Sequence, residues 1–362
     1  MRRRIGQLYS LSSILAYERF VDRCTDILEA KFRKFSDEDT PVEMGQFFQF
    51  YAFDVIGSTG HPFGLMEREG DDGIIASLHG ATVYSNFVGV VPESHPWIQK
   101  TLEITRPLGT KQTQNGLLDF IQFHINQRRK GITPNDKNDF LTKLLKLEEE
   151  GHNSHFDTHN SCRSNIAAGS DTTAVTLSAI FYYLLKNPDK MARLREEIDE
   201  RAAAGRLSDP VTFHESQEIP YLQAVIKEGL RIHPAISVVL ARSVPEAGAT
   251  ICGKYLPPNT EVGINPWVAH HNEEVFPSAN EFRPERWLAS KEEVAKMEGY
   301  FSAFGFGSRT CIGRHISFLE MTKIVPQLIR KFKFELNPPN AEWVITTNFF
   351  AKQRFHCKIR QK

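Results

Sequence analysis

The sequence predicts a mainly α-helical protein with a small β portion towards its C-terminal end. Helical apolar periods recur over the first two thirds of the 362 residues, and short β-branched segments begin only at residue 237. The chain shows no internal repeat, no low-complexity tract and no obvious linker. We therefore expect residues 1–362 to form a single domain.

The expected helices follow one another from the N-terminal end. Apolar residues at helical spacing predict helices over residues 10–35, 116–129, 136–150, 157–186, 189–204 and 221–232. Breaks rich in glycine and proline interrupt this pattern at 57–64 and 90–96. The helix over 157–186 is the longest, and it is predicted to stop before Asn187-Pro188 because the residue before proline avoids the α conformation.

The β portion comes next. Segments 237–244, 249–256 and 260–268 are short and β-branched, with turns at Gly248 and at Pro257-Pro258, so each is predicted to be a strand. A loop-rich stretch over 276–306 precedes a final helix over 312–332 and a weaker β tail. Pro326 lies inside that helix and is expected to kink it, because proline removes one backbone hydrogen bond.

Composition excludes several classes of protein. Lys+Arg and Asp+Glu both number 44, so the net charge is zero, whereas a nucleic-acid binder normally has a basic excess. The five cysteines are odd in number and widely spaced, which is typical neither of a disulfide framework nor of a zinc site. The most apolar stretch, 174–185, is too short to span a bilayer.

The strongest chemical signal is a cysteine in a glycine-rich loop, FGFGSRTCIG, over residues 304–313. Glycines allow a backbone to wrap around a flat cofactor, and N–H groups at a helix N-terminus stabilise a thiolate. Arg309 can reach an anionic group of that cofactor. A lone cysteine would more often be structural, but five residues together form the pattern F-x-x-G-x-R-x-C-x-G: Phe304, Gly307, Arg309, Cys311 and Gly313.

Two further motifs lie on predicted helices. Residues 168–173, AGSDTT, combine two small residues, which leave room for a ligand, with a carboxylate and hydroxyl groups. A polar helix face is the alternative for this hexad. Glu228 and Arg231 share one helix face, and on their own they would be a solvated ion pair worth a few tenths of a kcal/mol.

These residues together resemble the cytochrome P450 family, in its microsomal fungal form. The pattern around Cys311 is similar to the family's haem-binding loop, so the resemblance implies a P450-like fold and a haem whose iron is ligated by the Cys311 thiolate. It implies that Phe304 and Arg309 lie beside the haem. It also implies that Thr172 steadies the reduced oxygen and that Asp171 supplies protons from solvent, since O–O cleavage needs protons without flooding by water.

The resemblance reaches three more groups of residues. Glu228 and Arg231 match the family's E-x-x-R helix, whose partner would be Arg286 in the stretch PERW, and the network would hold the loop that presents Cys311. Arg242 and Arg2 match positions that bind haem propionates, with Arg3 or Arg4 as alternatives to Arg2. A solvated surface arginine is the other interpretation of each.

The implied function is a monooxygenase that inserts one oxygen atom of dioxygen into an apolar small molecule, typical of secondary metabolism. No flavin or nicotinamide fingerprint such as G-x-G-x-x-G is present, so the electrons are expected from a NADPH-dependent flavoprotein reductase. Two alternatives stay open: a haem-thiolate isomerase or dehydratase, and a truncated, inactive haem-binding remnant. Asp171 and Thr172 argue against the isomerase, because that chemistry needs no proton relay.

The resemblance also gives an expectation for the N-terminal end. The chain begins inside a family helix, so the domain is expected to be incomplete there, without the membrane anchor, the first strands and the loop over the substrate. We therefore expect an open sheet edge around 249–268, poor folding and weak haem binding. The sequence gives no location for this chain itself, whereas a full-length parent is expected at the endoplasmic reticulum membrane, facing the cytoplasm.

Overall fold

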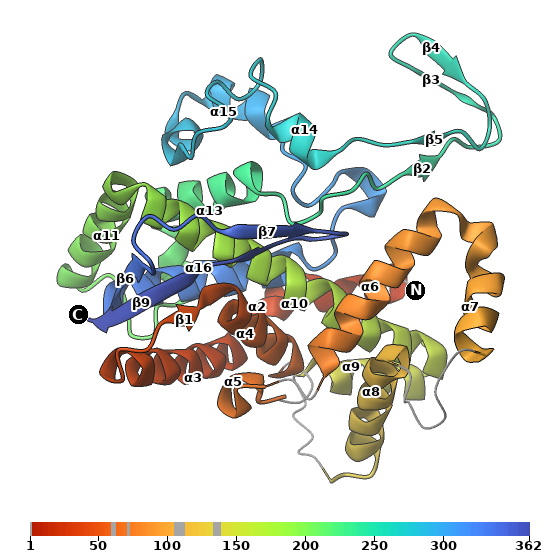
Figure 1. Ribbon diagram of the computed structural model, residues 1–362, viewed down its shortest axis with the longest axis horizontal. Coiled ribbons are helices and arrows are strands. Elements are labelled where there is room, and N and C mark those ends of the chain that lie inside the picture. Colours follow the sequence, from red (N-terminus) through yellow and green to blue (C-terminus); the bar gives the residue numbers. More distant parts are fainter. Residues whose placement is uncertain (1, 59–62, 71–72, 105–112, 133–138) are drawn as a thin grey trace.

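Helices build most of the fold, with four small antiparallel sheets among them in the described part of the chain (Figure 1). The computed structural model describes the backbone of residues 2–58, 63–70, 73–104, 113–132 and 139–362. The α-helices are α1 Arg2–Ile5, α2 Leu11–Leu15, α3 Glu18–Asp37, α4 Met44–Ser58, α5 Leu65–Arg68, α6 Ile74–Val90, α7 His95–Ile104, α8 Thr113–Arg129, α9 Phe140–Glu149, α10 His155–Lys186, α11 Pro188–Ala203, α12 Phe213–Gln217, α13 Pro220–Ile232, α14 Pro266–His270, α15 Lys291–Glu298 and α16 Arg314–Lys331. Short 3-10 turns are η1 Gly6–Tyr9, η2 Pro92–Ser94, η3 Pro284–Leu288 and η4 Gly307–Arg309.

The strands pair mostly in twos. One sheet has three strands in the order β1-β9-β6, and the pairs β2-β5, β3-β4 and β7-β8 complete the set. The strands are β1 Val42–Glu43, β2 Arg242–Ser243, β3 Ala249–Ile251, β4 Lys254–Leu256, β5 Glu261–Val262, β6 Phe332–Leu336, β7 Val344–Thr347, β8 Ala351–Arg354 and β9 His356–Gln361. Strands β2 to β5 form an arm that projects from the helical body, and Tyr255 near its tip is 64% exposed (Figure 1).

Helix α10 is the central element of the body. It begins with a reciprocal cap, in which the Ser154 hydroxyl accepts from the Asp157 N–H (3.1 Å) and the Asp157 carboxylate accepts from the Ser154 N–H (3.2 Å). It packs along α4 and also contacts α8, α13, α16 and β8. It ends at Lys186, because Pro188 prevents Asn187 from continuing the helix.

The hydrophobic core joins both ends of the chain. One buried cluster contains residues from Ile5 in α1 to Ile359 in β9. Aromatic rings link its layers: Phe181 of α10 lies 5.1 Å from Phe48 of α4 and 5.1 Å from Phe334 of β6 (ring centroids). The last helix and the last strands therefore hold α10 from one side while α4 holds it from the other.

Most predicted helices are present, but some boundaries were wrong. The helix expected over 10–35 is two helices, α2 and α3, which are separated at Ala16-Tyr17. The helix predicted over 136–150 is α9, whose first turn is capped by the Asp139 side chain; residues 136–138 lie outside the described residues. Residues 59–62 of the predicted break at 57–64 also lie outside the described residues. Helices α4, α6 and α15 were not predicted.

The β predictions were correct in place and too long in extent. Of 237–244 only Arg242–Ser243 is a strand, and 249–256 is the hairpin β3-β4. The end of 260–268 is helical instead, because Pro266 can start a helix and the Asn265 side chain accepts from the Trp267 N–H (2.9 Å). Helix α16 runs through Pro326, so proline does not end it.

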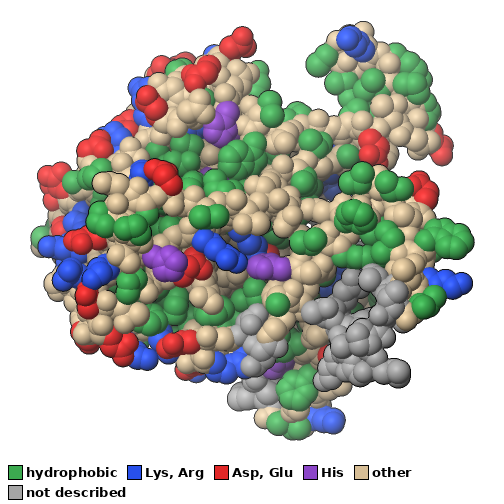
Figure 2. Space-filling view, viewed as in Figure 1, with side chains coloured by type: hydrophobic (Ala, Val, Ile, Leu, Met, Phe, Trp, Pro, Cys, Tyr) green, Lys and Arg blue, Asp and Glu red, His purple; other side chains and the backbone are tan. Residues whose placement is uncertain are grey.

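Hydrophobic and charged side chains are distributed unevenly over the face of the molecule that Figure 2 shows. Large hydrophobic side chains gather over α6 and α7 and on the arm, while charged side chains are denser on the opposite side of this face (Figure 2). Phe87 and Trp97 are 70% and 73% exposed. Among the described helices none is alone long and apolar enough to cross a membrane; the stretches Ile74–Val90 and Pro92–Thr101 meet the length and composition criteria only as a pair bent by 115°.

Candidate functional site

The cysteine loop is closed upon itself. The Cys311 N–H donates to the Phe304 carbonyl (2.7 Å), and the Phe304 ring packs against Phe318 of α16 at 5.3 Å between centroids. Gly305 and Gly307 have φ angles of +67° and +64°, in the left-handed region that side chains rarely adopt. The loop is thus held at both ends, and two of the residues between them, Gly305 and Gly307, carry no side chain.

The thiol of Cys311 is exposed at the head of a helix. Helix α16 begins at Arg314, only three positions later, with Gly313 as its N-cap. The positive end of the helix dipole favours an anion there, and such a position stabilises a thiolate. Arg309 lies in η4 of the same loop and is exposed. The loop therefore offers a reachable sulfur atom in a cationic setting.

One line of small side chains on α10 is open to solvent. Ser164 and Ala168 are exposed and Thr172 is partly exposed, at a spacing of four residues, while Ile166 and Ser170 beside them are buried. The Thr172 hydroxyl donates back to the Ala168 carbonyl (2.7 Å), so its oxygen still presents lone pairs outward. An exposed alanine in the middle of the central helix indicates space for a ligand.

Gly169 serves a different purpose from the one predicted. A Cβ at this position would lie 2.8 Å from the Ile56 side chain of α4. The glycine is therefore needed for the close packing of α10 on α4, and only Ala168 fits the prediction that small residues leave room for a ligand. The next turn is tied to α16, because the Thr173 hydroxyl donates to the Ser317 hydroxyl (3.3 Å).

The structure places Asp171 on a different face of α10, in the interior. Its side chain is only 1% exposed. One carboxylate oxygen, Oδ1, accepts from Gln49 of α4 and from the Lys352 ammonium of β8 (2.7 Å), and it lies 3.9 Å from His79 Nε2 of α6. The other oxygen, Oδ2, has no hydrogen-bond partner among the described residues. Burial raises the pKa of Asp171 to about 7.

The Glu228 network has the geometry that the sequence predicted. Arg231 donates two hydrogen bonds to the Glu228 carboxylate, from Nε (2.9 Å) and Nη2 (2.8 Å). Arg286 Nε donates a third at 3.1 Å, and all three side chains are buried. The sequence analysis missed Trp287, whose indole N–H also donates to Glu228 (2.9 Å). Buried pairing is confirmed here, and the solvated-pair alternative is wrong.

His270 connects this network to the cysteine loop. Its Nδ1 donates to the Arg231 carbonyl (3.1 Å), which leaves Nε2 as the acceptor for the Ser302 N–H (2.8 Å). Ser302 stands two residues before Phe304, the start of the loop. Burial lowers the pKa of His270 to about 4, so the ring is neutral at pH 7 and keeps both bonds. No local sequence pattern identified His270.

The arginines assigned to propionates lie in three different settings. Arg242 is exposed, and its Nη1 donates to the carbonyls of Leu240 and Ala241 (2.9 and 2.8 Å), the two residues before its strand. Arg4 binds Asp157 (3.1 Å) at the start of α10. The side chains of Arg2 and Arg3 lie outside the described residues. The propionate roles of Arg2, Arg242 and Arg309 stay predictions.

A cleft of about 760 Å³ opens beside the exposed line of α10. Its walls come from α6, α7, α8, α10 and the turn between β7 and β8. The apolar side chains include Leu78, Ala81, Leu117, Ala168, Phe349 and Phe350, and the polar ones include Tyr84, His95, Gln99 and Arg163. Ser164 and Ala168 of the exposed line therefore border this cleft, whose accessible surface is mostly apolar.

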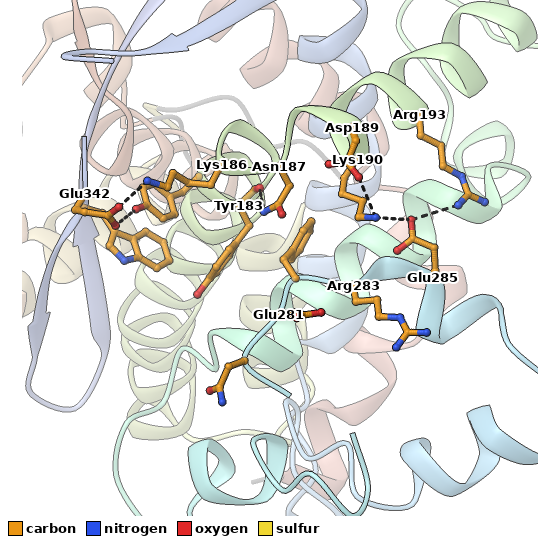
Figure 3. A pocket seen from close by; sticks show the side chains of 14 residues that line it. Tyr183, Lys186, Asn187, Asp189, Lys190, Arg193, Glu281, Arg283, Glu285 and Glu342 are labelled. Carbon is orange, nitrogen blue, oxygen red and sulfur yellow. Dashed lines mark hydrogen bonds and ion pairs between the residues drawn. The ribbon is translucent and has the colours of Figure 1, made fainter. Parts of the chain in front are cut away.

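Another cleft, of about 940 Å³, is polar, and Cys311 is not among the residues that line it (Figure 3). Its charged side chains satisfy one another: Glu285 binds Lys190 and Arg193 (3.3 and 3.2 Å), and Glu342 binds Lys186 (2.5 Å). Neither cleft is lined by Cys311, Asp171 or Thr172, but of the two only the cleft beside α10 is lined by a residue of the AGSDTT hexad, Ala168. Size alone is thus a poor guide to the functional site in this molecule.

Comparisons with known proteins agree with this geometry. The family model for cytochrome P450 matches residues 1–356. Pisatin demethylase of Fusarium vanettenii is 39% identical over the whole chain, which covers 72% of that enzyme, and cytochrome P450 monooxygenase ACRTS1 of Alternaria alternata is 32% identical, with 100% of this chain and 99% of that protein covered. The crystal structure of the cytochrome P450DA haem domain superposes with a TM-score of 0.83 at 18% identity, covering 100% of this chain and 76% of that domain.

The fold and the site define a haem-binding oxidoreductase of the monooxygenase class. The chain belongs to the cytochrome P450 family. The mainly helical fold with small sheets, the haem cofactor and the use of dioxygen, a substrate and a redox partner are therefore as the sequence predicted.

The residues present fit a haem. A haem would need a cysteine that its iron can reach, a helix face with only small side chains beside it, and backbone that can approach the ring closely. The exposed Cys311 thiol, the exposed Ala168 and the left-handed Gly305 and Gly307 supply these. A Cβ at Gly307 would meet no atom within 4 Å, so open space, not packing, borders this part of the loop.

Proposed function

We propose that this chain is a haem-thiolate monooxygenase in which Cys311 ligates the iron and an apolar small molecule is oxidised in the cleft beside α10. The observation that carries the proposal is the exposed thiol of Cys311 in a glycine-rich loop at the head of α16. Haem with an axial thiolate supplies the reductive activation of dioxygen when it is bound.

The protein's own part begins with the thiolate. The α16 dipole and the nearby Arg309 and Arg314 favour a negative sulfur atom, and the Cys311 N–H bond to Phe304 fixes the backbone that carries it. The bond from His270 to Ser302 holds the preceding segment against the buried Glu228 network. The loop is thereby anchored to α13 on one side and to α16 on the other.

The second part is the handling of protons on α10. Thr172 presents its hydroxyl oxygen on the exposed line of the helix, next to the space that a ligand at Ala168 would occupy. Asp171 precedes it with a carboxyl group whose pKa burial raises to about 7, close to the value that suits a group that both accepts and donates protons at neutral pH. We assign Thr172 to orienting and Asp171 to proton supply.

The third part is the choice of substrate and partner. The walls of the cleft from Leu78 to Phe350 favour apolar molecules of moderate size, since a drug-sized ligand needs a few hundred Å³. The chain carries no flavin or nicotinamide fingerprint, and we assign electron supply to a NADPH-dependent flavoprotein reductase. The similar proteins named as a demethylase and as monooxygenases support oxidation of a small molecule.

The test of the ligand is the absorption spectrum of the reduced, carbon monoxide-bound protein. The wild-type protein is expected to show the strongly red-shifted Soret band of a thiolate-ligated haem. Cys311→Ala is expected to lose that band, while Cys252→Ala, an exposed cysteine in the β3-β4 arm, keeps it. A red-shifted band in Cys311→Ala would contradict the assignment.

A further inference from the structure

Four elements that are distant in sequence meet around Asp171. Gln49 comes from α4, His79 from α6, Asp171 from α10 and Lys352 from β8. The meeting point is fixed by neighbours that carry no charge, since Gln353 donates to the Val175 carbonyl (3.0 Å) and so ties β8 to α10. The cluster is therefore a built feature of the fold, not a chance contact of long side chains.

The cluster runs from solvent to the interior. The His79 side chain is 40% exposed, that of Lys352 is 25% exposed and that of Asp171 is 1% exposed. The Lys352 ammonium contacts both His79 Nε2 and, at 2.7 Å, Asp171 Oδ1. Gln49 lies 3.5 Å from His79 Nε2 and also bonds to Asp171, so it holds the two groups in register. Each group is within hydrogen-bond reach of the next.

The pKa values of Asp171 and Lys352 support proton transfer between these two groups of the cluster. Burial raises the pKa of Asp171 to about 7, while burial, aided by the cation of Arg354 on the same strand, lowers the pKa of Lys352 to about 7. A proton moves readily between groups of similar pKa. Lys352 Nζ and Asp171 Oδ1 are 2.7 Å apart, so a proton can pass directly between them and the two groups titrate as a coupled pair.

We propose that His79 and Lys352 are the entry of a proton path that reloads Asp171 from solvent. This inference rests on the proposed function, because it assigns the supply side of the carboxyl group that serves Thr172. Protons pass from water to His79, from His79 to Lys352 and from Lys352 to Asp171 Oδ1. Oδ2 has no hydrogen-bond partner among the described residues, so the carboxyl group, once protonated on Oδ1, would turn to bring its proton away from Lys352 for release.

Lys352→Arg is the decisive variant. A guanidinium keeps the positive charge beside Asp171 but does not deprotonate at neutral pH, so it preserves an ion pair and blocks a relay. Lys358→Arg, on the adjacent strand β9 and paired with Asp39 at the surface, is the matched control. His79→Gln removes the titrating group at the entry while keeping a polar side chain there.

The first measurement follows turnover. Each variant, loaded with haem, is supplied with NADPH and a flavoprotein reductase without added substrate, and the peroxide released per NADPH is measured between pH 6 and pH 8. Reduction of dioxygen to water takes twice as many electrons and protons as reduction to peroxide, so slow proton supply favours peroxide. Lys352→Arg and His79→Gln are expected to lower water formation on the order of tenfold, a part of the roughly 100- to 10,000-fold that positioned acids and bases contribute.

The second measurement needs no turnover. Infrared difference spectra, with Asp171→Asn as the reference, report the pH at which the Asp171 carboxyl group titrates. In the wild-type protein the midpoint is expected near neutral pH, and in Lys352→Arg it is expected to fall, because the permanent cation stabilises the carboxylate. Lys358→Arg is expected to match the wild-type protein in both measurements.

The outcomes separate this inference from the proposed function. If haem content and the red-shifted band are normal, but Lys352→Arg or His79→Gln forms water at the wild-type rate and pH dependence, the relay is excluded and the monooxygenase assignment stands. An Asp171 midpoint unchanged by Lys352→Arg also excludes it. Absence of the red-shifted band in the wild-type protein contradicts the proposed function instead, and the infrared result then decides on the relay alone.

Discussion

Two buried carboxylates in this molecule have opposite surroundings. Glu228 accepts five hydrogen bonds, from Arg231 (two), Arg286, Trp287 and the Arg283 N–H, so both of its oxygens are satisfied. Asp171 accepts two, from Gln49 and Lys352, and both reach the same oxygen. The first carboxylate lies in a closed cage of donors, and the second is left half-bound.

The difference indicates that the two carboxylates have different roles, one structural and one chemical. A carboxylate that accepts several charged and neutral donors is held in its ionised form and in one position, which suits a structural anchor. A buried carboxylate with few hydrogen-bond donors can change its protonation state near neutral pH, and such a group suits proton transfer. The same residue class thus stabilises the loop of Cys311 in one place and serves chemistry in the other.

The largest expected effect is at the anchor. Glu228→Ala and Arg231→Ala each leave the remaining charges buried without their partner, at a cost of about 3–5 kcal/mol in the free energy of unfolding. Both variants are expected to lose most of their haem, although neither residue lies in the cysteine loop. Haem per chain and urea unfolding measure this, with the exposed Glu200→Ala as control. Normal haem content in both variants would show that the cage is not an anchor.

The next largest effect is expected on proton delivery at Thr172, with the fold unchanged. Thr172→Ala is expected to keep haem and the red-shifted band but to release several times more peroxide per NADPH, because the hydroxyl that orients the proton donor is gone. General acid–base groups contribute on the order of 100-fold or more, so the change is measurable with a simple peroxide assay. Thr176→Ala, whose hydroxyl makes the same kind of bond one turn later, is the control. Equal ratios in both variants would remove Thr172 from the chemistry.

A smaller effect is expected on the pH dependence of the free energy of unfolding, and it arises from Asp171. Burial raises the pKa of Asp171 from 3.8 to about 7, so the folded state holds a proton that the unfolded chain has lost. Its contribution to stability is complete below pH 3.8 and disappears as the pH rises through about 7, with a slope of at most about 1.4 kcal/mol per pH unit. The opposite shift of Lys352 acts above pH 7, outside this window.

Asp171→Asn should remove this dependence. The wild-type protein is expected to lose stability relative to the variant between about pH 4 and pH 7, measured by urea unfolding at each pH. Parallel stability curves across that range would mean that Asp171 is ionised in the folded protein. The comparison between the two sites would then no longer hold.

The smallest effect is expected beside the anchor, at its partly exposed neighbour Glu285. Glu285 lies one residue before Arg286, yet it faces the polar cleft with Lys190 and Arg193 (Figure 3). Exposed ion pairs contribute about 0–1 kcal/mol, so Glu285→Gln is expected to change the free energy of unfolding by less than about 1 kcal/mol and to keep its haem. A loss as large as that of Glu228→Ala would show that the anchor extends to the surface.

Sequence reasoning identified the groups whose pattern is local. The loop around Cys311 and the pair Glu228–Arg231 lie within ten residues or fewer, so their spacing alone reports their geometry. The long helix α10 was also predictable, because its cap and the proline after it are both visible in the sequence. Arg286 could be assigned through the family resemblance.

Contacts between distant segments could not be predicted in this way. Lys352 lies 181 residues and His79 lies 92 residues from Asp171 in the sequence, and the helix that carries Asp171 has no amphipathic pattern. His270 accepts a hydrogen bond from the Ser302 backbone N–H, and any acceptor could fill that role. Helices α4 and α6 were missed for a different reason. Both are apolar around much of their circumference, so the sequence shows no clear helical spacing of apolar residues. Arg242 shows the converse, because its sequence match was found while its guanidinium binds backbone carbonyls just before its own strand.

The walls of the cleft have a consequence for how this enzyme can change. His79 follows Leu78 directly, and Lys352 stands two residues after Phe350, so the segments that contact a substrate also carry the row leading to Asp171. Mutations that reshape the cleft for a new compound therefore act on two traits at once. Adaptation of substrate range along α6 or the β7-β8 turn should show strong epistasis with efficiency, and compensating changes should accumulate around Gln49 and Arg354, which touch the row without facing the cleft.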